Sequence, residues 1–235
     1  MRIDKLLSNM GLASRSESAR AAKCGEIRVN GIVVKKADVK VDPEKDCIEF
    51  RGKKIEYTEK VYVMLNKPQG YVSSTDSKDG KTVLELLPED LQKRGLFPCG
   101  RLDKDTLGLM ILTNDGETAH YLLSPKRHVS KIYNVKTKLP FSENDKQALE
   151  KGVRLDGGDV TRPAKVEILS PNEINITIVE GMYHQIKRML EAVGNEVTLL
   201  ERIEFGTLPL DTNLKRGEWR FLTDEEIKIL SDQTI

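Results

Sequence analysis

The sequence predicts an α+β protein in which a small N-terminal unit of two helices and a short sheet precedes a larger domain. Its 235 residues carry 38 Lys+Arg against 37 Asp+Glu and are 38% apolar, which is enough apolar material for a folded core. Helical periodicity near the N-terminus gives way to strand alternation after residue 25. Residues 1–40 hold nine Lys+Arg against four Asp+Glu, leaving 29 against 33 for the rest. The near-neutral total therefore conceals a basic N-terminus.

Two short helices are predicted at the N-terminus. Residues 2–10 contain four apolar residues at helical spacing, which are Ile3, Leu6, Leu7 and Met10. Gly11 follows them as a stop signal. The second helix starts after Ser14, which forms an S-x-x-E capping box with Glu17, and ends at Gly25. Both helices are therefore bounded by local signals.

Short strands follow these helices. Residues 27–34 alternate around the Asn30-Gly31 dipeptide, which favours a type I′ hairpin turn. The apolar stretch 47–50 supplies a further strand. The charged stretch 51–60 is interpreted as the end of the small domain and a linker. We therefore expect a small sheet packed with the two helices.

The sequence predicts two domains, over residues 1–58 and residues 59–235. Basic side chains are concentrated in the first of them. Such side chains can neutralise nucleic-acid phosphates and release counterions. A basic helix surface can also be no more than a solvated face, so charge alone leaves both interpretations open. The candidate RNA-binding residues are Arg2, Lys5, Arg15, Arg20, Lys23 and Arg28.

Several classes of protein are disfavoured by what the sequence lacks. No apolar run approaches the roughly 18 residues of a membrane span, and the N-terminus has no signal-peptide core, so we expect a cytoplasmic protein that does not bind membranes. The cysteines form no CxxC pair and the histidines form no HxH or HExxH pattern, which argues against a disulfide framework and a metal site. We interpret the histidines as structural; they are His120, His128 and His184.

Nucleotide chemistry is disfavoured on similar grounds. The GKT at residues 80–82 invites comparison with a phosphate-binding P-loop, but Thr75 stands where that motif needs a glycine. No G-x-G-x-x-G follows any predicted strand either. We therefore expect no nucleotide and no redox cofactor.

The larger domain opens with a strand over residues 61–67 that ends at Pro68, because proline donates no ladder hydrogen bond. Residues 99–116 then place several charged side chains between a glycine and a buried strand, before an NDG turn. Loop aspartates more often make caps or turns than catalyse reactions, although functional loops are positioned on such scaffolds. The role of Asp103 in this loop is therefore open at this point.

Further along the chain, residues 131–139 alternate as a strand, with Tyr133 as a core residue or a base-stacking platform. Residues 174–180 form another strand, and a helix follows that ends at Gly194, with Lys187 beside its apolar stripe. The C-terminal segment predicts a strand and then a helix capped by Thr223 and Glu226.

Two resemblances connect these segments. Residues 1 to about 45 resemble the S4 RNA-binding domain through the SR-x-x-x-A-R segment and the G-x-I-x-V-N-G strand and turn. Four segments in order resemble the pseudouridine synthases, in their RsuA-type branch. They are NKPQG at 66–70, GRLDKDTLGLMILTNDG at 100–116, KIYNV at 131–135 and EGMYHQIKRMLEAVGNEV at 180–197.

The second resemblance implies a catalytic domain with a mixed, mostly antiparallel sheet flanked by helices. It implies that Asp103 is the catalytic carboxylate, that Tyr133 packs on the target base and that Lys187 pairs with Asp103. It also implies substrate contacts from Arg101 and Leu190. Conversion of uridine to pseudouridine exchanges an N1 bond for a C5 bond, so its electrons balance without a metal, nucleotide or redox cofactor.

The expected substrate is a uridine of 16S ribosomal RNA, either naked or in an assembling small subunit, and the expected enzyme is a monomer. The lysine at position 187 favours the small-subunit branch, because relatives acting on large-subunit RNA tend to have arginine there. The alternatives are a synthase acting on 23S RNA and a non-catalytic S4-containing ribosome-binding or assembly factor.

Overall fold

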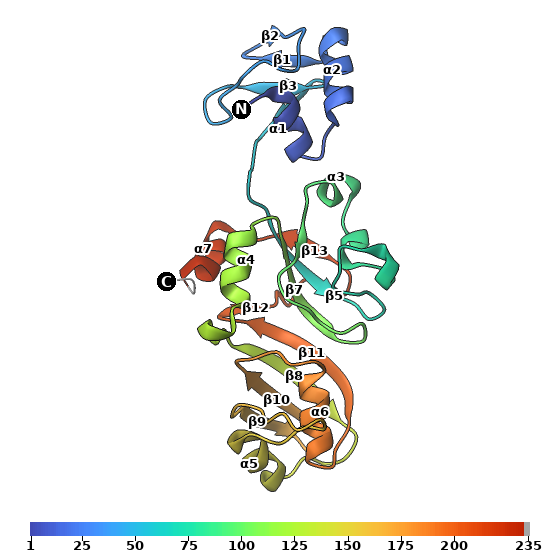
Figure 1. The fold of residues 1–235 in the computed structure, drawn as a ribbon, viewed down its shortest axis with the longest axis vertical. Coiled ribbons are helices and arrows are strands. Elements are labelled where there is room, and N and C mark those ends of the chain that lie inside the picture. Colours follow the sequence, from blue (N-terminus) through green and yellow to red (C-terminus); the bar gives the residue numbers. More distant parts are fainter. Residues whose placement is uncertain (233–235) are drawn as a thin grey trace. The chain divides into compact units, whose positions relative to one another are not determined.

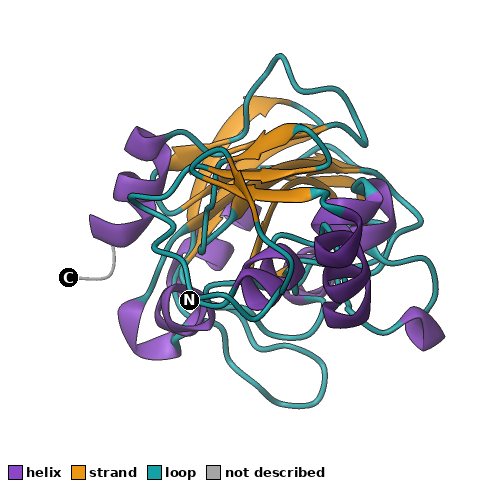
Figure 2. Cartoon of the chain, turned by 90° about the horizontal axis from the view of Figure 1, so that it is seen from above, coloured by secondary structure: helices purple, strands orange, loops and turns teal. Residues whose placement is uncertain are grey.

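The computed structural model describes residues 1–232, whose contacts form two compact units. The first unit comprises residues 1–61 and 87–97, and the second comprises residues 62–86 and the chain from Pro98 onward. Figure 1 labels their elements, and Figure 2 distinguishes helices, strands and the long loops between them. The inclusion of residues 87–97 in the first unit is a long-range feature that the sequence does not indicate.

The first unit packs two helices on a small antiparallel sheet. The helices are α1 (Ile3–Asn9) and α2 (Arg15–Cys24), and the sheet has the order β2-β1-β3-β4. Its strands are β1 (Ile27–Val29), β2 (Ile32–Val33), β3 (Ile48–Phe50) and β4 (Lys53–Ile55). Ile3, Leu6 and Leu7 are fully buried in its core. The predicted order of helices and hairpin is confirmed.

Local signals determine the ends of these elements. Ser14 and Glu17 form the predicted capping box, and Gly25 ends α2 with a positive φ of 76°. Asn30 and Gly31 have φ values of 51° and 77°, as a type I′ turn requires. Residues 51–60, interpreted as the end of the small domain and a linker, contain a strand that was not predicted, β4, which pairs with β3. Its three residues were too few and too charged to show a strand pattern.

Residues 87–97, which include α3 (Glu89–Gln92), join the first unit. Gly11, which has a φ of +69°, lies directly beside the backbone of Asp90. A Cβ atom at position 11 would overlap the Asp90 carbonyl oxygen. Close approach of two backbones therefore requires glycine here, in addition to its role after α1.

The second unit is built on a sheet with the main order β13-β5-β7-β11-β8-β10-β9. The strands are β5 (Tyr62–Lys67), β6 (Phe97–Pro98), β7 (Leu107–Thr113), β8 (Lys131–Thr137), β9 (Lys165–Ser170), β10 (Glu173–Ile178), β11 (Val197–Phe205), β12 (Leu208–Pro209) and β13 (Trp219–Phe221). β7 and β11 run parallel, while the other pairs along the main order are antiparallel. The expected mixed, mostly antiparallel sheet is confirmed.

Helices and short 3₁₀ segments flank this sheet. They are η1 (Ser77–Asp79), η2 (Val83–Leu86), α4 (Gly116–Leu123), η3 (Pro125–Arg127), α5 (Glu143–Lys151), α6 (Gln185–Ala192) and α7 (Asp224–Asp232). The NDG sequence is more than a turn, since Asp115 caps α4 by accepting a hydrogen bond from the Thr118 amide. Thr223 and Glu226 form the predicted cap of α7.

We expect Gly11→Ala to loosen the first unit more than a positive φ alone explains. An L-residue in the left-handed region costs about 1–2 kcal/mol, and the overlap with Asp90 adds about 1–3 kcal/mol of the kind seen for overpacking. Gly31→Ala is the matched control, because Gly31 has a φ of +77° and no atom within 4 Å of an added Cβ. Hydrogen exchange of the α1 and α2 amides measures the difference, and equal losses would contradict the role of the Asp90 contact.

Candidate active site

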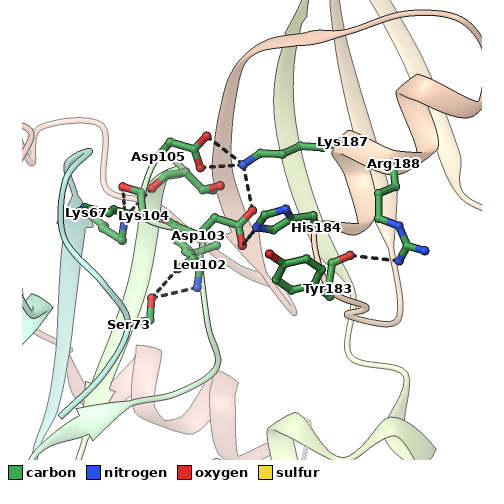
Figure 3. Close-up of polar contacts among 11 residues, drawn as sticks. Lys67, Ser73, Leu102, Asp103, Lys104, Asp105, Tyr183, His184, Lys187 and Arg188 are labelled. Carbon is green, nitrogen blue, oxygen red and sulfur yellow. Dashed lines mark hydrogen bonds and ion pairs between the residues drawn. The ribbon is translucent and has the colours of Figure 1, made fainter. Parts of the chain in front are cut away.

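A cavity of about 1210 Å³ lies within the second unit. Its walls come from segments far apart in the sequence, which are residues 72–74, 100–106, 122–133 and 178–186, together with part of β11. Three of the four segments that carry the family resemblance therefore reach one cavity. Figure 3 shows its polar centre, where the loop before β7 faces the start of α6.

Asp103 occupies the centre of this arrangement. The Lys187 ammonium lies 3.1 Å from Asp103 Oδ2, and His184 Nε2 lies 3.7 Å from Asp103 Oδ1 (Figure 3). The Asp103 side chain is partly exposed to the cavity. A carboxylate is thus held between a lysine and a histidine that both come from the region of α6.

Lys187 is shared between two carboxylates. It donates hydrogen bonds to Asp105 Oδ1 at 2.7 Å and Oδ2 at 2.9 Å, so Asp105 holds it more closely than Asp103 does. Burial works to lower the pKa of Lys187, but its hydrogen bonds to Asp105 and Asp103 outweigh burial and raise the pKa above its usual range. Burial works to raise the pKa of Asp105, but the hydrogen bond and charge of Lys187 hold that pKa below its usual range. Lys187 is therefore a fixed cation.

The loop that carries Asp103 is anchored from beneath by Lys67, the last residue of β5. Lys67 is fully buried, and its ammonium donates to the backbone oxygens of Thr106 (2.7 Å), Asp103 (2.9 Å), Pro68 (3.2 Å) and Lys104 (3.4 Å). Burial lowers the pKa of Lys67 to about 8, against the opposing charges of the nearby aspartates. One buried ammonium thus donates hydrogen bonds to backbone carbonyl groups of a loop that is not paired with a neighbouring strand.

A second anchor holds the other end of the loop. The Ser73 hydroxyl donates to the Leu102 carbonyl oxygen at 2.8 Å and accepts from the Leu102 amide at 3.0 Å. The residue just before Asp103 is therefore fixed by both of its backbone polar groups (Figure 3).

The first turn of α6 is organised by polar contacts. His184 precedes the helix with a positive φ of 47°, and the Tyr183 ring stacks on it at 3.9 Å between ring centres. The Gln185 side chain donates to Glu180 at 2.6 Å and accepts from the Met182 amide at 2.9 Å. These contacts set the unusual entry into α6 and hold His184 toward the cavity.

The candidate substrate-binding residues occupy different positions. Tyr133 is buried on β8 and lines the cavity, and Arg101 is exposed at its rim in the Asp103 loop. Leu190 is fully buried on the apolar face of α6 and is not among the residues that line the cavity. The structure therefore brings Asp103, Tyr133, Lys187 and Arg101 together, while Leu190 supports α6 from the core.

The candidate RNA-binding residues Arg2, Lys5, Arg15, Arg20, Lys23 and Arg28 are all exposed on the first unit. One of them, Arg2, is engaged with Asp4 at 2.6 Å. The others are exposed on α1, α2 and β1.

Sequence reasoning missed three residues of this site. Asp105 and Lys67 were seen only as parts of motifs, although a lysine closing a fully buried strand is a signal of an internal partner. His184 was interpreted as structural, and the structure places it beside Asp103. The histidine spacing argued only against a metal site and gave no information about a contact between His184 and a carboxylate.

Two structural observations concern the described residues as a whole. Within residues 1–232, no three His, Cys, Asp or Glu side chains gather closely enough to hold a metal ion. Every helix in that range is too short or too polar to cross a lipid bilayer.

Comparison with known proteins identifies the class to which this fold and site belong. Residues 1–47 match the S4 domain, and residues 61–192 match the family described as RNA pseudouridylate synthase. The chain belongs to the RNA pseudouridylate synthase family, as its motifs predicted.

Individual relatives match over nearly the whole chain. YtzG of Bacillus subtilis, described as an uncharacterized RNA pseudouridine synthase, is 45% identical, with 99% of each chain covered. The ribosomal small subunit pseudouridine synthase A of Escherichia coli K12 is 41% identical over 97% of this chain and 98% of the relative. A crystal structure of a pseudouridylate synthase superimposes with a TM-score of 0.70 at 42% identity, covering 98% of this chain and 99% of the other.

The buried position of Lys67 makes a prediction about stability and pH. Its pKa is about 8 in the folded protein and 10.5 ordinarily, so between these pH values the unfolded chain binds more protons. The free energy of unfolding therefore rises with pH in that window, because the buried amine of the folded protein has already lost the proton that the unfolded chain still binds. We expect the free energy of unfolding of the wild type to rise from pH 8 to 10.5 relative to that of Lys67→Met.

Urea unfolding at intervals of pH measures this difference. Lys104→Met is the matched control, since Lys104 is exposed in the same loop and its removal should leave the pH dependence unchanged. Parallel pH profiles for the wild type and Lys67→Met would show that Lys67 does not titrate in this way.

Proposed function

We propose that this protein isomerises a specific uridine of 16S ribosomal RNA to pseudouridine, with Asp103 as the catalytic carboxylate. The observation that carries the proposal is the position of Asp103, which lies in the cavity within reach of Lys187 and His184 on a doubly anchored loop. The small-subunit target is supported by the relatives named for that activity, at 41–42% identity over nearly their full length.

The reaction breaks the bond between uracil N1 and ribose C1′ and makes a bond between C5 and C1′. Asp103 either attacks C1′ to form a covalent intermediate, or removes a ribose proton to give a glycal. After the ring turns, C5 bonds to C1′ as Asp103 leaves C1′ or as the glycal regains its ribose proton. C5 then loses its proton and N1 gains one. The Lys187 ammonium lies 3.1 Å from Asp103 and places a positive charge beside the proposed catalytic carboxylate.

The target base has to leave its stack to reach Asp103, at a cost of a few kcal/mol. Tyr133 lies in the cavity wall and offers an aromatic face that recovers part of this cost. Arg101 at the rim is positioned to hold the RNA strand as the base enters. One chain supplies all of these groups, so we expect the enzyme to act as a monomer, in the cytoplasm.

Asp103→Asn tests the proposed chemistry directly. The substitution keeps size and removes the charge, so we expect tritium release from 16S RNA labelled at uridine C5 to fall by at least about a hundredfold, the lower end of what an acid–base group contributes. RNA binding should be retained. Asp105→Asn is the matched control: it removes the other partner of Lys187, an exposed ion pair worth about 0–1 kcal/mol, so we expect at most about a fivefold decrease.

Wild-type-like turnover by Asp103→Asn would exclude Asp103 as the catalytic carboxylate. Release of tritium from 23S RNA alone would redirect the proposal to large-subunit RNA. Lack of release from either RNA by the wild type, with binding intact, would instead favour a non-catalytic assembly factor.

The N-terminal unit is proposed to bind RNA through its exposed cations. Replacement of the three cations of α2, Arg15, Arg20 and Lys23, by glutamine should make the dependence of log affinity on log salt shallower by about 2 to 3, at roughly 0.7–0.9 for each phosphate that is no longer neutralised. The matched control replaces Lys36, Lys53 and Lys54, which are exposed on the same unit outside α1, α2 and β1. Equal changes in the two triple variants would remove the specific role of α2.

A further inference from the structure

Two cations line the cavity beside Tyr133. Tyr133 and Arg202 are directly opposite each other in the antiparallel pair of β8 and β11, so their side chains lie on the same face of the sheet. Lys131 precedes Tyr133 by two residues on β8 and shares that face because strand side chains alternate. All three residues line the cavity that contains Asp103. A base packed on Tyr133 would therefore have both cations as neighbours.

Neither cation has a carboxylate partner within the described residues. Arg202 is 1% exposed; its Nε donates to the Leu109 carbonyl oxygen at 2.8 Å, and its Nη2 has no partner. Lys131 donates to the Val129 carbonyl oxygen at 2.9 Å. Both cations lie over the ring of Phe205, at 5.1 Å for Arg202 and 5.8 Å for Lys131.

Such a pair works against folding. Burial and the charge of Arg202 together lower the pKa of Lys131 to about 8, with only weak opposition from Cys99 and Glu180. Glu180 is itself engaged with Arg162 and Gln185. Buried charges without partners are costly, and apolar residues of similar volume are often as stable or more so. A packing role therefore does not explain why two cations stand side by side here.

We infer that Lys131 and Arg202 stabilise the negative charge that the uracil ring acquires when its bond to the ribose breaks. This inference rests on the proposed function. When the N1–C1′ bond breaks, its electron pair stays on the ring and is shared between N1 and the ring carbonyl oxygens, while C1′ passes to Asp103 or forms a glycal. The charge disappears when the ring's electron pair forms the C5–C1′ bond, which displaces Asp103 from C1′ or is accompanied by return of a proton to the glycal. The C5 proton is then lost while N1 gains a proton.

Lys187 is not available for this task, because it is held by Asp103 and Asp105. Lys131 supplies a hydrogen-bond donor at the cavity wall, and Arg202 adds a fixed charge next to Tyr133 on the neighbouring strand. Fixed charges that act on developing charge in a site with little water are among the strongest contributions to catalysis. A backbone phosphate is a different anion, and an effect on it would appear in RNA affinity rather than in the rate of bond breaking.

The test compares Lys131→Met with the wild type in single-turnover reactions on 16S RNA that carries uridine or 5-fluorouridine. Removal of one such donor typically costs about 10²–10³-fold in rate, so we expect a drop of about a hundredfold on uridine RNA. Fluorine stabilises the ring anion, so loss of a group that acts on this charge should matter less. The rate on 5-fluorouridine RNA is measured as disappearance of 5-fluorouridine from a nuclease digest. We expect Lys131→Met to decrease this rate about tenfold less than it decreases the rate on uridine RNA.

Three further measurements separate this role from a structural one. Lys131→Arg keeps the charge and should retain most of the rate, and Lys136→Met, at an exposed position on the same strand, should match the wild type. The unfolding midpoint of Lys131→Met should be unchanged or higher, because a desolvated charge is removed. RNA affinity should also be unchanged.

The inference is overturned if Lys131→Met reacts with uridine RNA as fast as the wild type, or if it slows both substrates equally. It is also overturned if only RNA affinity falls, which would indicate a phosphate contact. These outcomes are distinct from failure of the proposed function, in which the wild type itself would convert no uridine in ribosomal RNA.

Discussion

The buried ammonium of Lys67 is the interaction on which the rest of the site depends. Asp103 stands on an irregular loop, and a loop so close to the core carries carbonyl groups that water cannot reach. Lys67 donates to three of these oxygens from the end of β5, including the Asp103 carbonyl itself, and also to the carbonyl oxygen of Pro68. A neutral side chain would supply fewer donors, so the desolvation that lowers the pKa of Lys67 is the cost of a rigid loop.

The parallel pairing of β7 with β11 connects the Asp103 loop to the cavity wall that contains Arg202 and Tyr133. Gly108 has a φ of +96°, and a Cβ atom there would overlap the carbonyl oxygen of Arg202. Glycine therefore lets the two strands approach where Gly108 pairs with Arg202. Because Arg202 also pairs with Tyr133 on its other side, the Asp103 loop, the cation and the aromatic ring are set by consecutive strands of one sheet.

The sequence predicted what short-range physics determines. The Ser14–Glu17 capping box and the Asn30-Gly31 turn depend on residues at most three positions apart, and both were correctly predicted. The packing of residues 87–97 within the first unit, and the contacts of Lys67 with residues 103–106, join segments that are far apart in the sequence, and no periodicity carries such information. The family resemblance brought Asp103, Tyr133 and Lys187 to attention, but the sharing of Lys187 with Asp105 and the approach of His184 needed coordinates.

Charge is distributed unevenly across the cavity, and this distribution fits the direction in which electrons move in the proposed reaction. On one side, the Asp103 carboxylate lines the cavity, and the neighbouring ammonium of Lys187 is shared between Asp103 and Asp105. On the other wall, Lys131 and Arg202 leave a net positive charge beside Tyr133, where the base would lie. Bond breaking makes C1′ more positive and the ring more negative, so both changes are favoured by charges already in place before the substrate arrives.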